Sequence, residues 1–185
     1  IMITSSSNSV QSGDVLIASG DSDKGVTGII SIIGGKSSLF DGAQVSVVSV
    51  DSVAGNGGLL SLVGGEGSYG GSVKVRGATG LIGDGGDVSL EGGTGQESGG
   101  FVAISGGTSI ANGAKGGSIS IIAGTVSSDA SEGGSLIIGG GQSYAGKGGD
   151  VEITGGSSEL GRSGSIAVQS SPSVQSPTGA VMISS

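Results

Sequence analysis

A small residue followed by alternating aliphatic positions recurs along the whole chain at intervals near fifteen residues. A fixed repeat of this length is typical of proteins that use one structural unit many times. Successive leading residues are separated by 13 to 17 positions. The leaders are Gly13, Gly28, Ala43, Gly58, Gly71, Gly86, Gly100, Gly117, Gly134, Gly149, Gly164 and Gly179.

The second and fourth residues after every leader are aliphatic. This period-two alternation predicts an extended strand with one buried face. A helix would need 3.6-residue periodicity, and glycine at this density would cost about 1 kcal/mol per residue relative to alanine. The pairs are Val15/Ile17, Ile30/Ile32, Val45/Val47, Leu60/Leu62, Val73/Val75, Val88/Leu90, Val102/Ile104, Ile119/Ile121, Leu136/Ile138, Val151/Ile153, Ile166/Val168 and Val181/Ile183.

Glycine accounts for 44 of the 185 residues, and glycine-rich chains without a period are usually disordered. Here hydrophobic residues make up 34% of the chain and occupy ordered positions, which favours a folded structure. A bundle of polyproline-II helices would need a three-residue glycine period, whereas this repeat is about fifteen residues long.

These patterns predict an all-β fold, a single-domain parallel β-solenoid (β-helix) of about 12 coils with a ~15-residue repeat over residues 1–185. Each strand is too short to bury itself, so each coil is expected to lie on the previous one at ~4.8 Å. Apolar residues ten or eleven positions after a leader, such as Leu39, Val53 and Tyr144, are interpreted as inward contacts from the opposite wall.

Paired glycines are predicted to serve the corners of the coils in two ways. They would turn the chain through positive φ, and they would let opposite backbones approach closely. The two longest repeats place extra residues around 109–114 and 127–131, which are predicted to form loops at a corner.

The composition excludes several kinds of chemistry and of partner. The chain has no cysteine and no histidine, which removes disulfides, thiolate chemistry and imidazole catalysis. Its net charge is −8, with only 7 basic residues, which disfavours nucleic acid. No stretch approaches the ~18–20 apolar residues of a membrane span. We therefore expect no nucleic-acid partner, no membrane span, no cofactor, no metal and no enzymatic activity.

Repeated acidic residues suggest calcium as an alternative, because Asp14, Asp87 and Asp150 each follow a leader directly. Calcium-binding β-rolls repeat their Gly and Asp residues in every nine-residue turn. Here the aspartates recur in only three repeats, so solvated strand-edge residues are the favoured interpretation.

A carboxylate cluster of the kind that cleaves glycosides is the second chemical alternative. Asp84, Asp87 and Glu91 lie close in sequence, with Lys74 and Arg76 one repeat earlier. In register, Arg76 would lie beside Glu91 as an ordinary cross-strand ion pair worth about 0.2–1 kcal/mol.

A candidate association surface lies in the early repeats. Ile33, Val48 and Val63 follow the second aliphatic residue of three consecutive repeats, with Ile29 and Leu59 nearby. If these side chains point outward, they form an exposed apolar stripe of the kind that marks association surfaces. The alternative is a locally wider core.

Both ends of the chain are predicted to lack a polar cap, since the sequence starts and stops in strand-like segments. Such ends would stack end to end or belong to a slice of a longer array, and the start fits a mature or trimmed fragment. The terminal stacking residues are Ile1, Met2, Ile3, Val181, Met182 and Ile183.

The run Gly-Gly-Asp-Val-x-Leu/Ile-x-Gly-Gly at 85–93 and 148–156 resembles Gly/Ser-rich repeat tracts in secreted or surface proteins of stramenopile algae and oomycetes. Viral fibres and bacterial adhesins can converge on similar repeats. The resemblance implies an extracellular or cell-surface setting and a structural role, and it brings no catalytic residues.

The expected function is a structural, extracellular solenoid that self-assembles into, or decorates, a filament, surface coat or adhesive matrix. Its partner would be itself, end to end or laterally. The alternative is an ice- or glycan-binding solenoid that uses a flat serine-rich face, with Ser31, Ser46 and Ser61 between the aliphatic pairs.

Overall fold

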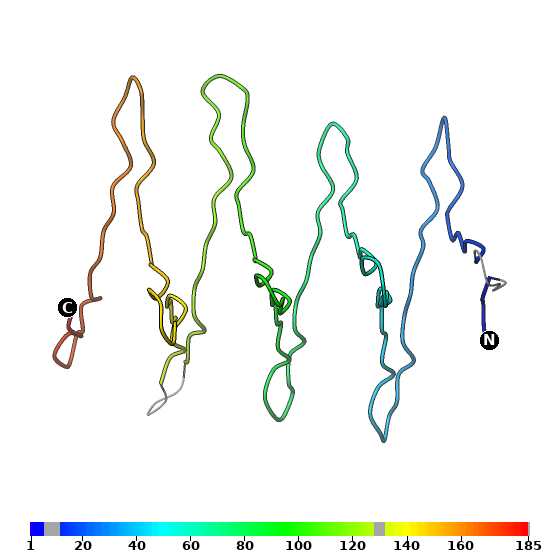
Figure 1. Cartoon of the computed structure of the whole chain (residues 1–185), viewed down its shortest axis with the longest axis horizontal. Coiled ribbons are helices and arrows are strands. Elements are labelled where there is room, and N and C mark those ends of the chain that lie inside the picture. The colour runs from blue at the N-terminus through cyan, green and yellow to red at the C-terminus, as the bar shows by residue number, and fades with distance from the viewer. Residues whose placement is uncertain (6–11, 128–131, 185) are drawn as a thin grey trace. The chain divides into compact units, whose positions relative to one another are not determined.

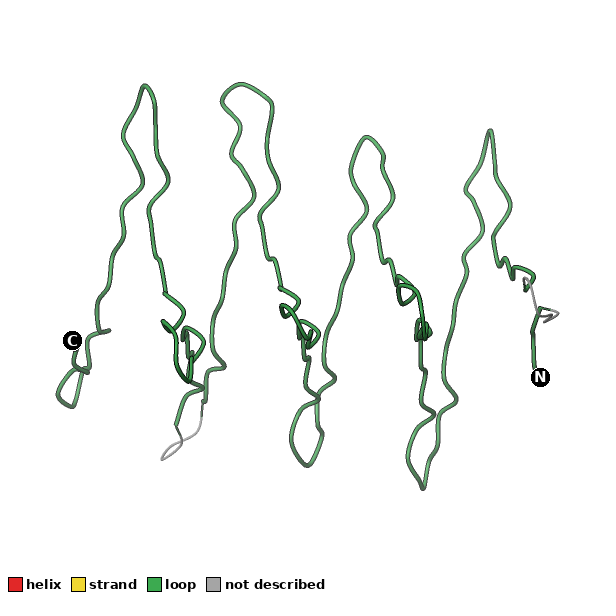
Figure 2. Cartoon of the chain, in the orientation of Figure 1, coloured by secondary structure: helices red, strands yellow, loops and turns green. Residues whose placement is uncertain are grey.

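The computed structural model describes residues 1–5, 12–127 and 132–184, and none of these residues lies in a helix or a strand (Figures 1 and 2). The predicted parallel β-solenoid is therefore wrong for the single chain. The chain divides into two units, Ile1–Ser89 and Leu90–Ser185.

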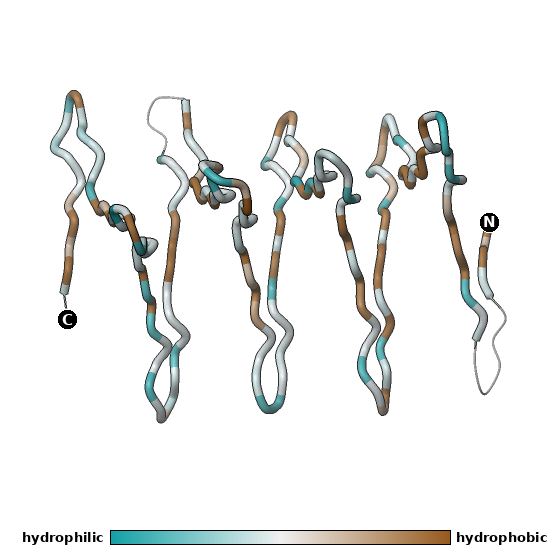
Figure 3. The backbone as a smooth tube through the Cα atoms, turned by 90° about the horizontal axis from the view of Figure 1, so that it is seen from above, coloured by the Kyte–Doolittle hydropathy of each residue, from teal (hydrophilic) through white to brown (hydrophobic). Residues whose placement is uncertain are grey.

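Each unit alternates between aliphatic segments and loops. We call the seven residues that begin at a leader, such as 58–64, an aliphatic segment, and the stretch that joins two segments a loop. Figure 3 shows that the apolar residues concentrate along the segments, whereas hydrophilic residues gather in the loops. The predicted repeat is thus present as a regular alternation between apolar segments and more hydrophilic loops along the chain.

Nine loops are closed by one backbone hydrogen bond, in which the leader N–H donates to a carbonyl at the start of its loop, with N···O distances of 2.8–3.1 Å. We call this closure the neck of the loop. The donor–acceptor pairs are Ala43–Gly35, Gly58–Val50, Gly71–Gly65, Gly86–Ala78, Gly100–Gly93, Gly117–Gly107, Gly134–Gly124, Gly149–Gly141 and Gly164–Gly156. Each bond joins the two ends of one loop, and among the described residues no backbone–backbone hydrogen bond joins aliphatic segments side by side, so no ladder of paired strands is present.

Glycine allows the backbones to touch at the necks. A Cβ added at Gly155 would lie 2.6 Å from the carbonyl oxygen of Gly164, closer than real Cβ contacts. Among the described residues only Gly113 has a positive φ, of 74°. The prediction of close backbone approach is confirmed, and the prediction that paired glycines turn through positive φ is wrong.

The long loop 107–117 contains a turn of its own. The N–H of Ala114 donates to the carbonyl of Ala111 at 3.2 Å, with Gly113 between them. The loop predicted around 109–114 is confirmed, whereas residues 128–131 of the other predicted loop lie outside the described residues.

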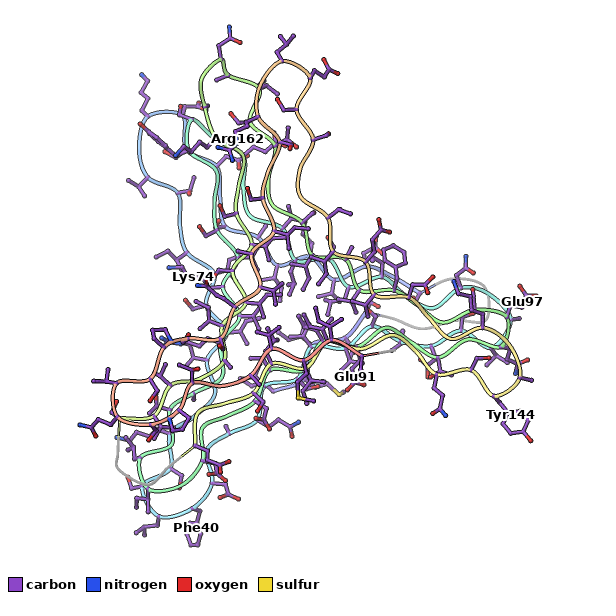
Figure 4. All side chains as sticks on the ribbon, turned by 90° about the vertical axis from the view of Figure 1, so that its left-hand side faces the viewer. Phe40, Lys74, Glu91, Glu97, Tyr144 and Arg162 are labelled. Atoms are coloured by element: carbon purple, nitrogen blue, oxygen red, sulfur yellow. The ribbon has the colours of Figure 1, made fainter. Side chains whose placement is uncertain are left out.

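Seen in the view of Figure 4, the loops within a unit extend in different directions. In Leu90–Ser185, Glu97 and Tyr144 lie in loops that extend the same way, and Arg162 lies in a loop that extends another way. In Ile1–Ser89, Phe40 lies at the outer end of its loop. The aromatic rings of Phe40 and Tyr144 are therefore at the periphery of their units.

No described residue is buried. The first aliphatic residue of each pair is 49–55% exposed, and the second is at least 62% exposed. Leu39, Val53 and Tyr144, which were predicted to contact the opposite wall, are almost fully exposed because they lie in loops and not against the segments. A dry interior within the single chain is therefore also a wrong prediction.

Candidate self-association surface

The exposed area of the chain is far larger than a compact protein of its mass would have. The chain of 17.2 kDa exposes 18880 Å². A compact monomer of this mass exposes about 7,800 Å², and the fully unfolded chain about 25,000 Å². The excess over a compact monomer is about 11,000 Å², and the exposed residues include the aliphatic pairs of the segments.

In several aliphatic segments most backbone groups make no backbone–backbone hydrogen bond among the described residues. In segment 58–64 only the N–H of Gly58 makes a backbone–backbone hydrogen bond among the described residues. Extended backbone with free N–H and C=O groups is a template for pairing with another chain. In native proteins the large majority of buried backbone N–H and C=O groups are hydrogen-bonded. A partner that covers these segments must therefore supply matching donors and acceptors.

The residues predicted as an association surface lie on three consecutive segments, 28–34, 43–49 and 58–64. Ile29, Ile33, Val48, Leu59 and Val63 are 77–90% exposed. These three segments carry no charged residue. The stacking of Ile33, Val48 and Val63 on adjacent coils depended on the solenoid, which the single chain does not form, so the association role of these residues stays a prediction.

The predicted terminal residues are exposed as well. They lie close to the two ends of the described chain, and each is at least half exposed. The six residues are Ile1, Met2, Ile3, Val181, Met182 and Ile183. The end-to-end contact of these residues stays a prediction, as does the association of the segments.

The candidate chemical residues are not brought together. The described part of the chain contains no group of three or more acidic residues that could hold a metal ion, so no such group gathers Asp14, Asp87 and Asp150. In the same residues there is no pocket. The predicted pairing of Arg76 with Glu91 required stacked coils. The structure shows an ion pair elsewhere, between Lys147 Nζ and Asp150 Oδ2 at 2.7 Å, and both side chains are exposed.

A set of serines at the outer end of the loops, away from the necks, was not predicted from the sequence. Each serine Oγ accepts a hydrogen bond from the N–H three residues later, at 2.9–3.1 Å. The six are Ser22, Ser37, Ser52, Ser143, Ser158 and Ser173. In each unit they recur every fifteen residues, and four stand in a Ser-x-x-Gly motif that could have identified them. These local bonds define the loop ends without help from other loops.

Comparison of the chain with protein-family models, with curated proteins and with solved structures finds no match. Among the described residues there is no helix long and apolar enough to cross a membrane, in agreement with the sequence prediction.

Proposed function

We propose that the chain is a structural protein that works by associating with copies of itself. The observation that supports this proposal is the exposed area of 18880 Å², of which a compact monomer would retain about 7,800 Å². Burial of apolar area contributes roughly 25 cal/mol per Å², so association is the route by which this chain gains the stability that folding alone does not supply. Obligate interfaces commonly exceed 2,000 Å², well within the area that this chain exposes.

The loops suit an outward-facing role in such an assembly. Their ends are held by serine hydroxyls, and they carry exposed charged and aromatic side chains such as Glu97, Arg162 and Tyr144 (Figure 4). An assembly held by its segments would therefore present an array of loops that carry charged and aromatic side chains. The resemblance of the repeats to Gly/Ser-rich tracts of surface proteins supports an extracellular filament, surface coat or adhesive matrix.

The ice- or glycan-binding alternative required a flat serine-rich face. Ser31, Ser46 and Ser61 lie on separate segments that form no sheet within the described chain. No specific observation favours this alternative, and self-association is the function that the geometry supports best.

Electron microscopy of the purified chain, combined with light scattering over a range of concentrations, tests the proposal. We expect particles far larger than 17.2 kDa that grow in number with protein concentration. A uniform 17.2 kDa species at every concentration would remove the basis of the proposal.

A further inference from the structure

We propose, resting on the function above, that copies of the chain associate through backbone pairing between their aliphatic segments. A segment of one copy would lie along a segment of the next, and the loops would stay outside the contact. This pairing joins different chains. Within one chain, among the described residues, segments 28–34, 43–49 and 58–64 make no backbone–backbone hydrogen bond with one another.

The first support for this inference is the lack of backbone hydrogen bonds along a described segment. In segment 43–49, the N–H of Ala43 closes a neck, and no other backbone–backbone hydrogen bond among the described residues involves the segment. The remaining groups form a short edge of donors and acceptors. Such an edge is normally satisfied by another extended backbone once water is displaced.

The second support is the graded exposure of the aliphatic pairs. The first member of every pair is about half exposed, at 49–55%, and the second is more exposed. Val45 and Leu60, for example, are 52% and 49% exposed, so about half of the surface of each remains open to a contact. A second extended segment placed alongside would cover part of this surface, because neighbouring paired strands lie ~4.8 Å apart with their side chains in contact.

The third support is that a copy of the same chain fits the spacing. A partner that pairs with successive segments must present its own extended segments at the same interval of about fifteen residues. A second copy meets this requirement by construction, and symmetric self-association is the commonest form of oligomer. Segments 28–34, 43–49 and 58–64 carry no charged residue, so their contact adds no local charge repulsion to that between chains of net charge −8.

The loops are poor candidates for the same contact. Their ends already satisfy backbone donors internally, as where Ser52 Oγ accepts from the N–H of Gly55 at 2.9 Å. Hydrophilic residues concentrate in them (Figure 3). Both prolines of the chain, Pro172 and Pro177, also lie between aliphatic segments and not within one.

Proline scanning separates backbone pairing from every other mode of association. One variant carries Ser31→Pro, Ser46→Pro and Ser61→Pro, which remove one N–H from each of three segments and fit extended backbone. The matched control carries Asp23→Pro, Ser38→Pro and Val53→Pro in the adjoining loops. Each control proline directly follows a serine that caps a loop end, at the turn position that favours proline.

We expect the segment variant to raise the concentration for half-assembly about 100-fold, since three inter-chain hydrogen bonds are lost. The loop control should stay within about twofold of the parent chain. Equal weakening of both variants would place the loops in the contact and overturn the inference. Assembly of the segment variant like the parent would overturn backbone pairing and leave the proposed function standing. A parent chain that stays monomeric at every concentration would overturn both the backbone pairing and the proposed function.

Amide hydrogen exchange on the assembled parent chain gives a second readout that needs no variant. The amides of 59–64 should exchange slowly, and those of 51–57 fast, because only the former gain inter-chain partners. Fast exchange throughout 59–64 in an assembled chain would contradict the pairing while leaving self-association intact.

Discussion

Replacement of Gly77 by alanine should open one loop of the chain and leave the rest unchanged. Gly77 stands at the neck of loop 78–86, where the N–H of Gly86 donates to the carbonyl of Ala78 at 2.8 Å. A Cβ at position 77 would lie 2.7 Å from the carbonyl carbon of Gly86 and closer still to its oxygen, whereas real Cβ atoms essentially never approach within 3.0 Å. The two backbones must therefore separate, and the neck hydrogen bond weakens or breaks.

The expected cost is about 1 kcal/mol, the net contribution of one backbone hydrogen bond. That loss corresponds to a roughly fivefold change in the closed-to-open ratio of the loop. Gly83→Ala in the same loop is the matched control, because a Cβ there meets nothing within 4 Å and its φ is not positive. Alanine at such a site is neutral or stabilises by about 0.4–1 kcal/mol through the unfolded chain.

Amide hydrogen exchange at Gly86 measures the neck directly. We expect Gly77→Ala to accelerate exchange at Gly86 about fivefold, and Gly83→Ala to leave it unchanged or slower. Equal exchange rates at Gly86 in both variants would show that the close approach of Gly77 and Gly86 does not hold the neck, and would refute the reasoning.

Three further predictions concern association. Leu60→Ser with Leu62→Ser should weaken assembly at least ~10-fold, because serine removes apolar area from a contact surface, while Val53→Ser in the adjoining loop should not, as sedimentation velocity would show. Adding salt from about 0.01 to 0.15 M should strengthen assembly, because screening reduces repulsion between chains of net charge −8; light scattering that falls with salt would contradict this. In a chain without cysteine, Leu60→Cys should cross-link between chains with a short bis-maleimide and Val53→Cys should not, as denaturing gels would reveal; equal cross-linking would count against a segment contact.

The local organisation of the chain could be predicted from its sequence. The alternation around Leu60 and Leu62 marks an extended segment, and the flanking glycines mark the necks, because these features depend on residues close in sequence. Whether each segment is covered by its own chain or by another copy could not be predicted. A segment with one aliphatic face is satisfied equally by the next repeat of its own chain or by a segment of another copy, so a one-chain solenoid and an open chain share the same pattern.

The glycines and serines of the loops illustrate the same limit. Close backbone approach was the correct reason for glycine at positions such as Gly155, but positive φ was not, because both reasons select glycine and the sequence does not separate them. The serines at loop ends, such as Ser143, were readable from Ser-x-x-Gly at fifteen-residue spacing. They were overlooked because serine is abundant throughout the chain and a single serine carries little information.

Sedimentation equilibrium of the purified chain, carried down to the lowest measurable concentration, tests most directly whether copies cover what one chain leaves exposed. The expected result is a mass that is a multiple of 17.2 kDa, together with loss of ordered structure when dilution or denaturant separates the copies. A species of 17.2 kDa that melts cooperatively at a temperature independent of concentration would contradict the central claim, because such a chain would have to bury its aliphatic segments alone.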